Sequence, residues 1–137
     1  MYSIIRQALL DLLNGESITK IKQAYRTEVS EISAYPVAII APSEHDADYH
    51  QTSPSSNKET YIFTIRVIYP FTEGQATADL ALEQALDELI GVLRDKTCLG
   101  SAADWIKPVP GRWGYEQREG GVMRIAELNV QAVKYVG

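Results

Sequence analysis

The alternation of apolar and polar side chains between residues 61 and 69 is the clearest pattern in this chain. β-Branched or aromatic residues stand at every second position: Tyr61, Phe63, Ile65, Val67 and Tyr69. A period of two in residues of these types predicts a β-strand. We expect the strand to end at Pro70, because proline has no N–H to donate to a neighbouring strand.

After a short polar turn the period changes from two to 3.6. Six apolar residues then fall on one stripe of a helix from about residue 77: Leu82, Ala85, Leu86, Leu89, Ile90 and Leu93. Asp79, Glu83 and Asp87 fall on the opposite stripe, which we expect to face solvent. Thr72 and Gln75 have the spacing of a capping box, so this turn could cap the helix. The pattern predicts a helix of roughly 18 residues whose apolar side packs on a sheet.

A first helix is predicted after Ser3, which can act as its N-cap. Its apolar residues recur at helical spacing between Ile4 and Leu13, and Asn14-Gly15 can supply a left-handed stop. The apolar face could dock a partner or pack on the protein's own sheet. We favour packing, because most amphipathic helices bury this face in their own core.

Two further strands are predicted before residue 61. Residues 17–27 mix apolar side chains with Lys20, Lys22 and Arg26, which is typical of an exposed edge strand. Residues 35–42 form a nearly continuous apolar run between two prolines, as expected for a strand buried on both faces.

The polar stretch of residues 44–59 predicts a hairpin with strand character around residues 46–51. Long loops of this kind often meet partners, so we regard Asp46, Asp48 and Tyr49 as candidate contact residues.

The C-terminal part of the chain predicts two more strands. Residues 105–115 contain Pro108 and Pro110, so this strand must lie at an edge or contain a bulge. Residues 122–136 predict a long strand with one apolar face that Arg124 and Lys134 interrupt. Because strands cluster instead of alternating with helices, we predict an α+β fold: one mostly antiparallel sheet with two helices packed on one face.

Length and charge narrow the classes of function. The 137 residues suffice for a single domain, residues 1–137. The formal net charge of −5 argues against a general DNA-binding module, which would present a basic face. One cysteine, Cys98, excludes an internal disulfide. We find no signal peptide and no apolar run long enough for a membrane span, so no membrane partner is predicted.

The polar residues include a few candidates for a metal site or a catalytic nucleophile. His45, Asp46, Asp48 and His50 suggest a metal site, but an odd spacing turns the two histidines to opposite sides of a strand. Cys98 lacks the basic surroundings of a nucleophile. No phosphate-binding loop, dinucleotide motif or zinc pattern is present in the sequence. We therefore predict no catalytic residues, no metal and no cofactor, and a protein that is not an enzyme.

Basic and aromatic residues occur together between residues 112 and 124, in and between the two C-terminal strands that the sequence predicts. The group consists of Arg112, Trp113, Tyr115, Arg118 and Arg124. Such a combination can bind nucleic acid, although two nearby glutamates offset part of its charge. The alternative, which we favour for Trp113, is a packing or subunit-interface role.

The order of these segments resembles a known family. Tyr35-Pro36-Val37-Ala38-Ile39-Ile40 precedes the polar hairpin and the strand of residues 61–69, and Asp87-Glu88-Leu89-Ile90-Gly91-Val92-Leu93 lies in the acidic helix. Trp105-Ile106-Lys107-Pro108-Val109-Pro110-Gly111 and the closing strand from Gly121 to Val130 follow. This layout is similar to that of the small tail-completion, or tail-terminator, proteins of long-tailed bacteriophages and prophages.

The resemblance implies a structural role in the virion, at the tail and neck, with assembly in the cytoplasm of the bacterial host. Members of the family form a homo-oligomeric ring, usually a hexamer, at the head-proximal end of the tail tube. The ring stops tube elongation and contacts the neck and head-completion proteins. DNA passes through it without sequence-specific binding, and an acidic lumen would repel phosphates. The family has no catalytic residues.

The ring hypothesis assigns roles to the charged segments. Lys20, Lys22 and Arg26 could complement the acidic helix face of a neighbouring subunit, since a head-to-tail ring needs two different patches. Asp46, Asp48, Tyr49 and Trp113 are further candidate interface residues. Asp79, Glu83 and Asp87 would face solvent or the lumen. Two alternatives stay open: a different connector or adaptor that binds the portal or capsid, and a small ligand-binding domain or enzyme.

Overall fold

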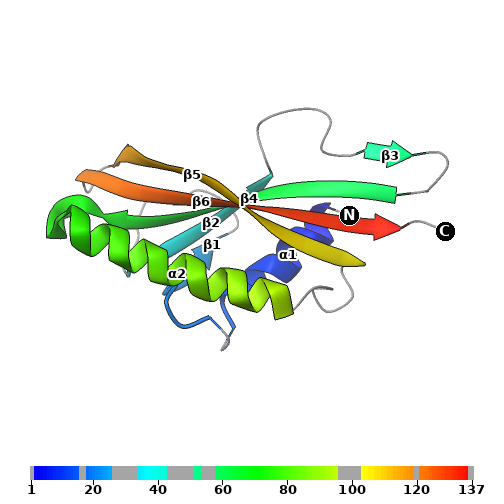
Figure 1. The fold of residues 1–137 in the computed structure, drawn as a ribbon, viewed down its shortest axis with the longest axis horizontal. Helices are drawn as coiled ribbons and strands as arrows, with labels where there is room; N and C mark the ends of the chain where they lie inside the picture. Colours follow the sequence, from blue (N-terminus) through cyan, green and yellow to red (C-terminus); the bar gives the residue numbers. More distant parts are fainter. Residues whose placement is uncertain are drawn as a thin grey trace.

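A computed structural model describes residues 2–15, 18–25, 34–42, 51–53, 58–95, 103–118 and 121–135. The elements follow in this order: α1 (Tyr2–Leu13), β1 (Gln23–Tyr25), β2 (Val37–Pro42), β3 (Gln51–Ser53), β4 (Lys58–Pro70), the 3₁₀ turn η1 (Phe71–Glu73), α2 (Gln75–Asp95), β5 (Trp105–Arg118) and β6 (Gly121–Tyr135). The fold is α+β, as predicted, with both helices on one face of a twisted sheet (Figure 1). None of the described helices is both long and apolar enough to cross a membrane.

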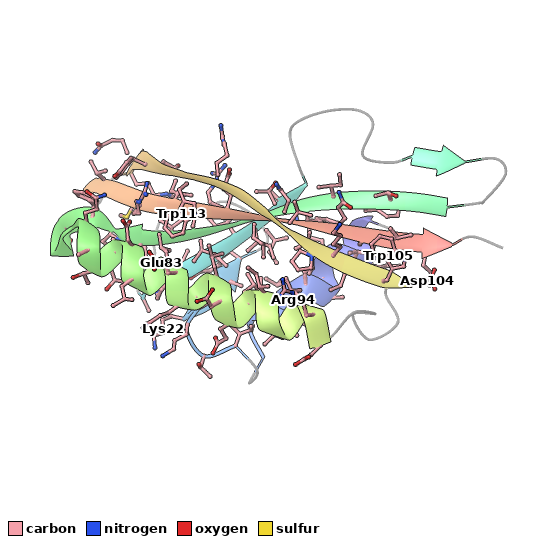
Figure 2. All side chains as sticks on the ribbon, viewed as in Figure 1. Lys22, Glu83, Arg94, Asp104, Trp105 and Trp113 are labelled. Carbon is pink, nitrogen blue, oxygen red and sulfur yellow. The ribbon has the colours of Figure 1, made fainter. Side chains whose placement is uncertain are left out.

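The sheet is built around the two longest strands, β4 and β6. Its order is β1-β2-β4-β6-β5, and the short β3 pairs with the start of β4. Only β1 and β2 run parallel among the described pairs; the others are antiparallel. The prediction that this strand lies at an edge or contains a bulge is confirmed: β5 lies at an edge, and its register shifts between Pro110 and Trp113. Trp105 and Trp113 lie toward opposite ends of this strand (Figure 2).

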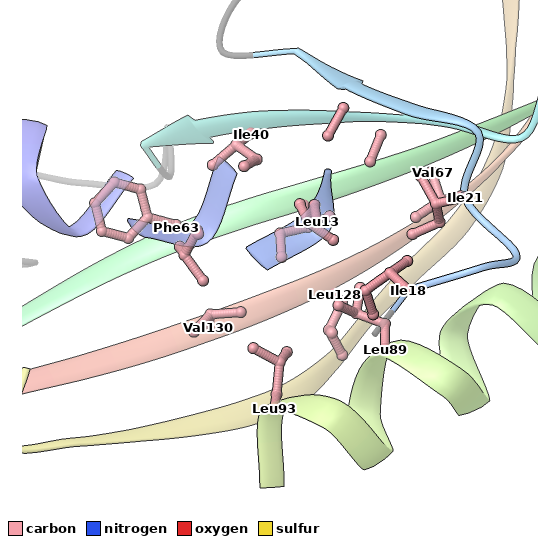
Figure 3. Packing of buried hydrophobic residues seen from close by; sticks show 14 of the residues in the cluster. Leu13, Ile18, Ile21, Ile40, Phe63, Val67, Leu89, Leu93, Leu128 and Val130 are labelled. Carbon is pink, nitrogen blue, oxygen red and sulfur yellow. The ribbon is translucent and has the colours of Figure 1, made fainter. Parts of the chain in front are cut away.

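The main core fills the space between the helices and the inner face of the sheet. Leu13 of α1 and Leu89 and Leu93 of α2 are buried against β-strand side chains such as Phe63 (Figure 3). Leu9 of α1 belongs to the same cluster. The remaining strand contributions to this cluster include Ala38, Ile40, Ile65, Val67, Ala126, Leu128, Val130 and Ala132. The period-two pattern of β4 and β6 therefore identified the face that the helices cover.

A smaller core lies on the outer face of the same sheet. It joins buried residues of β2, β4 and β6: Val37, Ile39, Ile68, Met123 and Ile125. Tyr25 and Tyr35 pack against it. β2 therefore contributes to both cores, as its uninterrupted apolar sequence predicted.

Two local predictions about the helix ends are wrong. α2 begins at Gln75, after η1 and Gly74, so Thr72 is not its cap; Gly74 has φ +99°, which glycine adopts easily. Gly15 is not in the left-handed region. Asn14 instead uses its side-chain amide to hold the backbone of β1, accepting from Ala24 N–H at 2.9 Å and donating to Ala24 C=O at 3.2 Å.

The predicted start of α1 also needs correction. The helix begins at Tyr2, so Ser3 lies in its first turn and does not precede it. Ile4 is 58% exposed although it was assigned to the apolar face, whereas Ile5 is fully buried.

Candidate functional site

A cluster of aromatic and charged side chains lies where α2, β5 and β6 meet at one end of the sheet. We call it the aromatic–arginine cluster: Phe71, Asp79, Trp113, Tyr115 and Arg124. The guanidinium carbon of Arg124 lies 4.5 Å from the ring centroid of Tyr115 and 5.2 Å from that of Trp113. Phe71 contacts Tyr115 edge to face, with the two ring centroids 5.6 Å apart.

Arg124 is the centre of this cluster. Its Nε donates to Asp79 Oδ1 at 2.8 Å, and its Nη1 donates to the carbonyl of Gly114 at 3.1 Å. Its side chain is only 14% exposed, so these partners compensate a charge that has lost most of its water. Arg124 thus fastens the first turns of α2 to both strands of the β5–β6 hairpin.

The aromatic rings of the cluster retain substantial access to solvent. Trp113 is 39% exposed and Tyr115 is 54% exposed, and the apolar side chain of Val122 is exposed nearby on β6. Tryptophan and tyrosine supply large apolar area at a small cost in side-chain entropy, which makes them common energetic centres of protein interfaces. Because Arg124 holds both rings in place before any partner arrives, this surface is preorganised for binding.

An ion-pair network lies on the outer side of the same hairpin. Glu127 of β6 pairs with Arg112 at 3.2 Å and with Arg66 at 3.6 Å. Glu116 of β5 pairs with Arg118 at 3.7 Å and with Arg66 at 3.8 Å. Together with Trp113, Tyr115 and other hairpin residues, four of these side chains line an open pocket of about 360 Å³.

The network depends on a close approach of β5 to β6 at the bulge. A Cβ atom added to Gly111 would lie 2.7 Å from the carbonyl oxygen of Glu127, which is closer than real contacts allow. Glycine therefore lets the bulged strand stay against β6, and Arg112 emerges next to it with its side chain 80% exposed.

Glu88 of α2 has a structural role that the sequence did not suggest. Its carboxylate accepts from Thr19 N–H at 2.6 Å, from Thr19 Oγ1 at 2.6 Å and from Lys20 N–H at 2.8 Å. Burial raises the pKa of Glu88, but the hydrogen bonds from Thr19 and Lys20 and the charge of Lys20 outweigh burial, so that its pKa is lowered overall. Glu88 therefore attaches the segment before β1 to the middle of α2.

This attachment changes the interpretation of the basic segment. Lys20 and Lys22 are exposed, but the backbone of Lys20 is bound to the acidic helix of its own chain. The basic segment and α2 are thus neighbours within one subunit. Arg26, Asp46, Asp48 and Tyr49, the other predicted contact residues, lie outside the described residues.

The three residues of the predicted acidic stripe differ in their exposure to solvent. Glu83 and Asp87 are exposed on α2, whereas Asp79 is half-buried and pairs with Arg124. The stripe therefore presents two of its three carboxylates to solvent. Figure 2 shows Glu83 and Trp113 at the same end of the molecule, far from Trp105 and Asp104.

The remaining chemical candidates of the sequence lie outside the described residues: His45, His50 and Cys98. Within the described ranges, no group of three or more His, Cys, Asp or Glu side chains is arranged to hold a metal ion. Comparison of the sequence with protein-family models and with curated proteins gives no match to either.

The sequence indicates only part of the aromatic–arginine cluster. The basic and aromatic residues of the last hairpin stood out, and Arg124 was recognised as a charge on an apolar face. The helical pattern predicts a solvent-facing Asp79, and the sequence gives no signal for Arg66 or Glu127. A lone arginine on the buried face of a strand is the signal that points to a carboxylate on the covering helix.

Proposed function

We propose that this protein is a structural component of a phage tail, a ring-forming tail terminator at the head-proximal end of the tube. The observation that carries the proposal is the preorganised aromatic surface at one end of a rigid sheet. Exposed rings held by a buried arginine suit a protein–protein contact. Paired charges make up half of the residues that line the pocket beside them.

The kind of assembly, a ring at the end of the tail tube, is proposed from the resemblance in segment order to tail-terminator proteins. The expected fold of that family is a sheet flanked by helices, and the fold described above is compatible with it. The net charge of −5 per subunit also suits a ring through which DNA moves without binding, because negative charge repels phosphates.

Deletion of the gene from its phage or prophage genome tests the proposal. We expect particles whose tails vary in length and exceed the normal length, together with full heads that carry no tail. Electron microscopy of lysates measures both outcomes, and a plasmid copy of the gene should restore normal particles. Tails of normal length that fail to join heads would instead indicate a connector or adaptor. Normal, infectious particles would refute a role in tail assembly.

A further inference from the structure

Two exposed apolar spots with opposite flanking charges lie on this subunit. The first, which we call the aromatic patch, consists of Trp113 and Tyr115 with Arg112 beside them, and all three line the same pocket. The second, which we call the α2 patch, consists of Leu80 flanked by Glu83 and Asp87. Leu80 is 55% exposed, and spacings of three and seven residues place the three side chains on one face of the helix.

The charge that the aromatic patch presents to solvent is positive. The side chain of Arg112 is 80% exposed, whereas that of its ion-pair partner Glu127 is 15% exposed. Arg112 donates from Nε to Glu127, and its remaining N–H groups can still reach a second carboxylate. An acidic partner surface would complement this exposed guanidinium group.

The α2 patch has the complementary properties. Its leucine offers an exposed apolar side chain that can cover exposed ring surface, and its two exposed carboxylates can reach a guanidinium group. The buried side of α2 carries Ala78, Leu82 and Ala85. The α2 patch lies on another side of the helix and is therefore not used to hold the fold together.

We infer that the aromatic patch of one copy of this chain binds the α2 patch of a second copy. Leu80 would pack against Trp113 and Tyr115, and Glu83 and Asp87 would pair with Arg112. Two different patches on every subunit make a contact that can be repeated from copy to copy. The inference rests on the proposed function, because a ring requires such a contact, and it names the surfaces that form it.

A charge-exchange experiment on the purified full chain tests the contact. Arg112→Glu makes both patches acidic, and the double variant Glu83→Lys, Asp87→Lys makes both basic. We expect each variant alone to self-associate at least tenfold more weakly than the unaltered chain. An equimolar mixture of the two should recover association, because each acidic patch then meets a basic one. Sedimentation velocity against the 15.2 kDa monomer mass measures all three samples.

Two further variants make the experiment decisive. Arg94→Glu is the matched control, since it makes the same change of charge at an exposed position near the other end of α2, and it should leave association unchanged. Leu80→Ser removes the exposed side chain without changing charge and should weaken association as well. Circular dichroism verifies that each variant is folded; if Arg112→Glu is not, Arg112→Ser takes its place.

Each outcome decides the inference. A chain that stays monomeric at the highest attainable concentration overturns it, and so does a mixture of the two charge variants that associates no better than either alone. The proposed function is judged separately by the deletion phenotype. If the deletion gives irregular tails but the charge exchange fails, the terminator role stands and this contact is rejected. If the charge exchange succeeds but the deletion leaves tails normal, the contact stands and the terminator role is rejected.

Discussion

Replacing Arg124 by methionine tests whether the aromatic–arginine cluster stabilises the subunit. Methionine keeps an unbranched apolar chain of similar reach but removes the guanidinium group. The variant loses the 2.8 Å bond to Asp79, the 3.1 Å bond to the Gly114 carbonyl and the contacts with two aromatic rings. It also leaves the half-buried carboxylate of Asp79 without this charged partner.

The expected cost follows from these contacts. A hydrogen bond to a charged group contributes about 1.5–3 kcal/mol, and a neutral one about 1 kcal/mol. Each cation–π contact adds about 0.5–1 kcal/mol. The apolar methionine recovers part of this through burial, so we expect Arg124→Met to lower the free energy of unfolding by about 3 kcal/mol.

Urea unfolding followed by far-ultraviolet circular dichroism and tryptophan fluorescence measures this change. Arg94→Met is the control, because Arg94 is exposed in the last turn of α2 and should cost no more than about 0.5 kcal/mol. A double-mutant cycle with Asp79→Asn then isolates the ion pair, for which we expect a coupling energy of about 1–2 kcal/mol. If Arg124→Met costs no more than Arg94→Met, the cluster does not clamp α2 to the hairpin.

Two further predictions concern the bulge and the N-terminal segment. Gly111→Ala should destabilise the protein by about 1–3 kcal/mol in urea unfolding, because its Cβ would meet the β6 backbone at 2.7 Å. Gly114→Ala, which has open space around it, should change stability much less, and equal losses would contradict the steric argument. Glu88→Gln should remove part of the acid sensitivity of folding. The pKa of Glu88 is lowered in the folded state, so its contribution is complete above the ordinary value of 4.5 and is lost as the pH falls through the lowered pKa. Urea unfolding of the unaltered chain and of Glu88→Gln between pH 3 and 7 measures how the free energy of unfolding depends on pH. If this dependence is the same for both proteins, protonation of Glu88 is not coupled to folding.

The pattern of side chains predicted which faces of the elements are buried. The alternation in β4 and β6 separated the helix-covered face from the outer face, and the stripe on α2 matched its buried residues Leu82, Ala85, Leu89 and Leu93. These predictions succeeded because burial of apolar surface depends on the local period of the chain.

Contacts between distant residues were harder to predict. Periodicity tells which side of an element is buried but not which element lies opposite. The pairing of Arg124 with Asp79 and of Glu88 with the backbone at Thr19 therefore could not be inferred. The pattern predicts that Asp79 faces solvent, because acidic residues on a helix usually face water. The parallel pairing of β1 with β2 was likewise beyond the local pattern.

The position of β6 has a consequence for how the chain folds. β6 follows the other described strands in the chain, yet it lies inside the sheet between β4 and β5 and pairs along the whole length of β4. Until it emerges from the ribosome, the inner faces of β4 and α2 lack the strand that completes the core, and β5 lacks the strand with which it pairs. The high contact order of this arrangement slows folding. A nascent chain must therefore keep its apolar α2 stripe from aggregating until β6 has been synthesised.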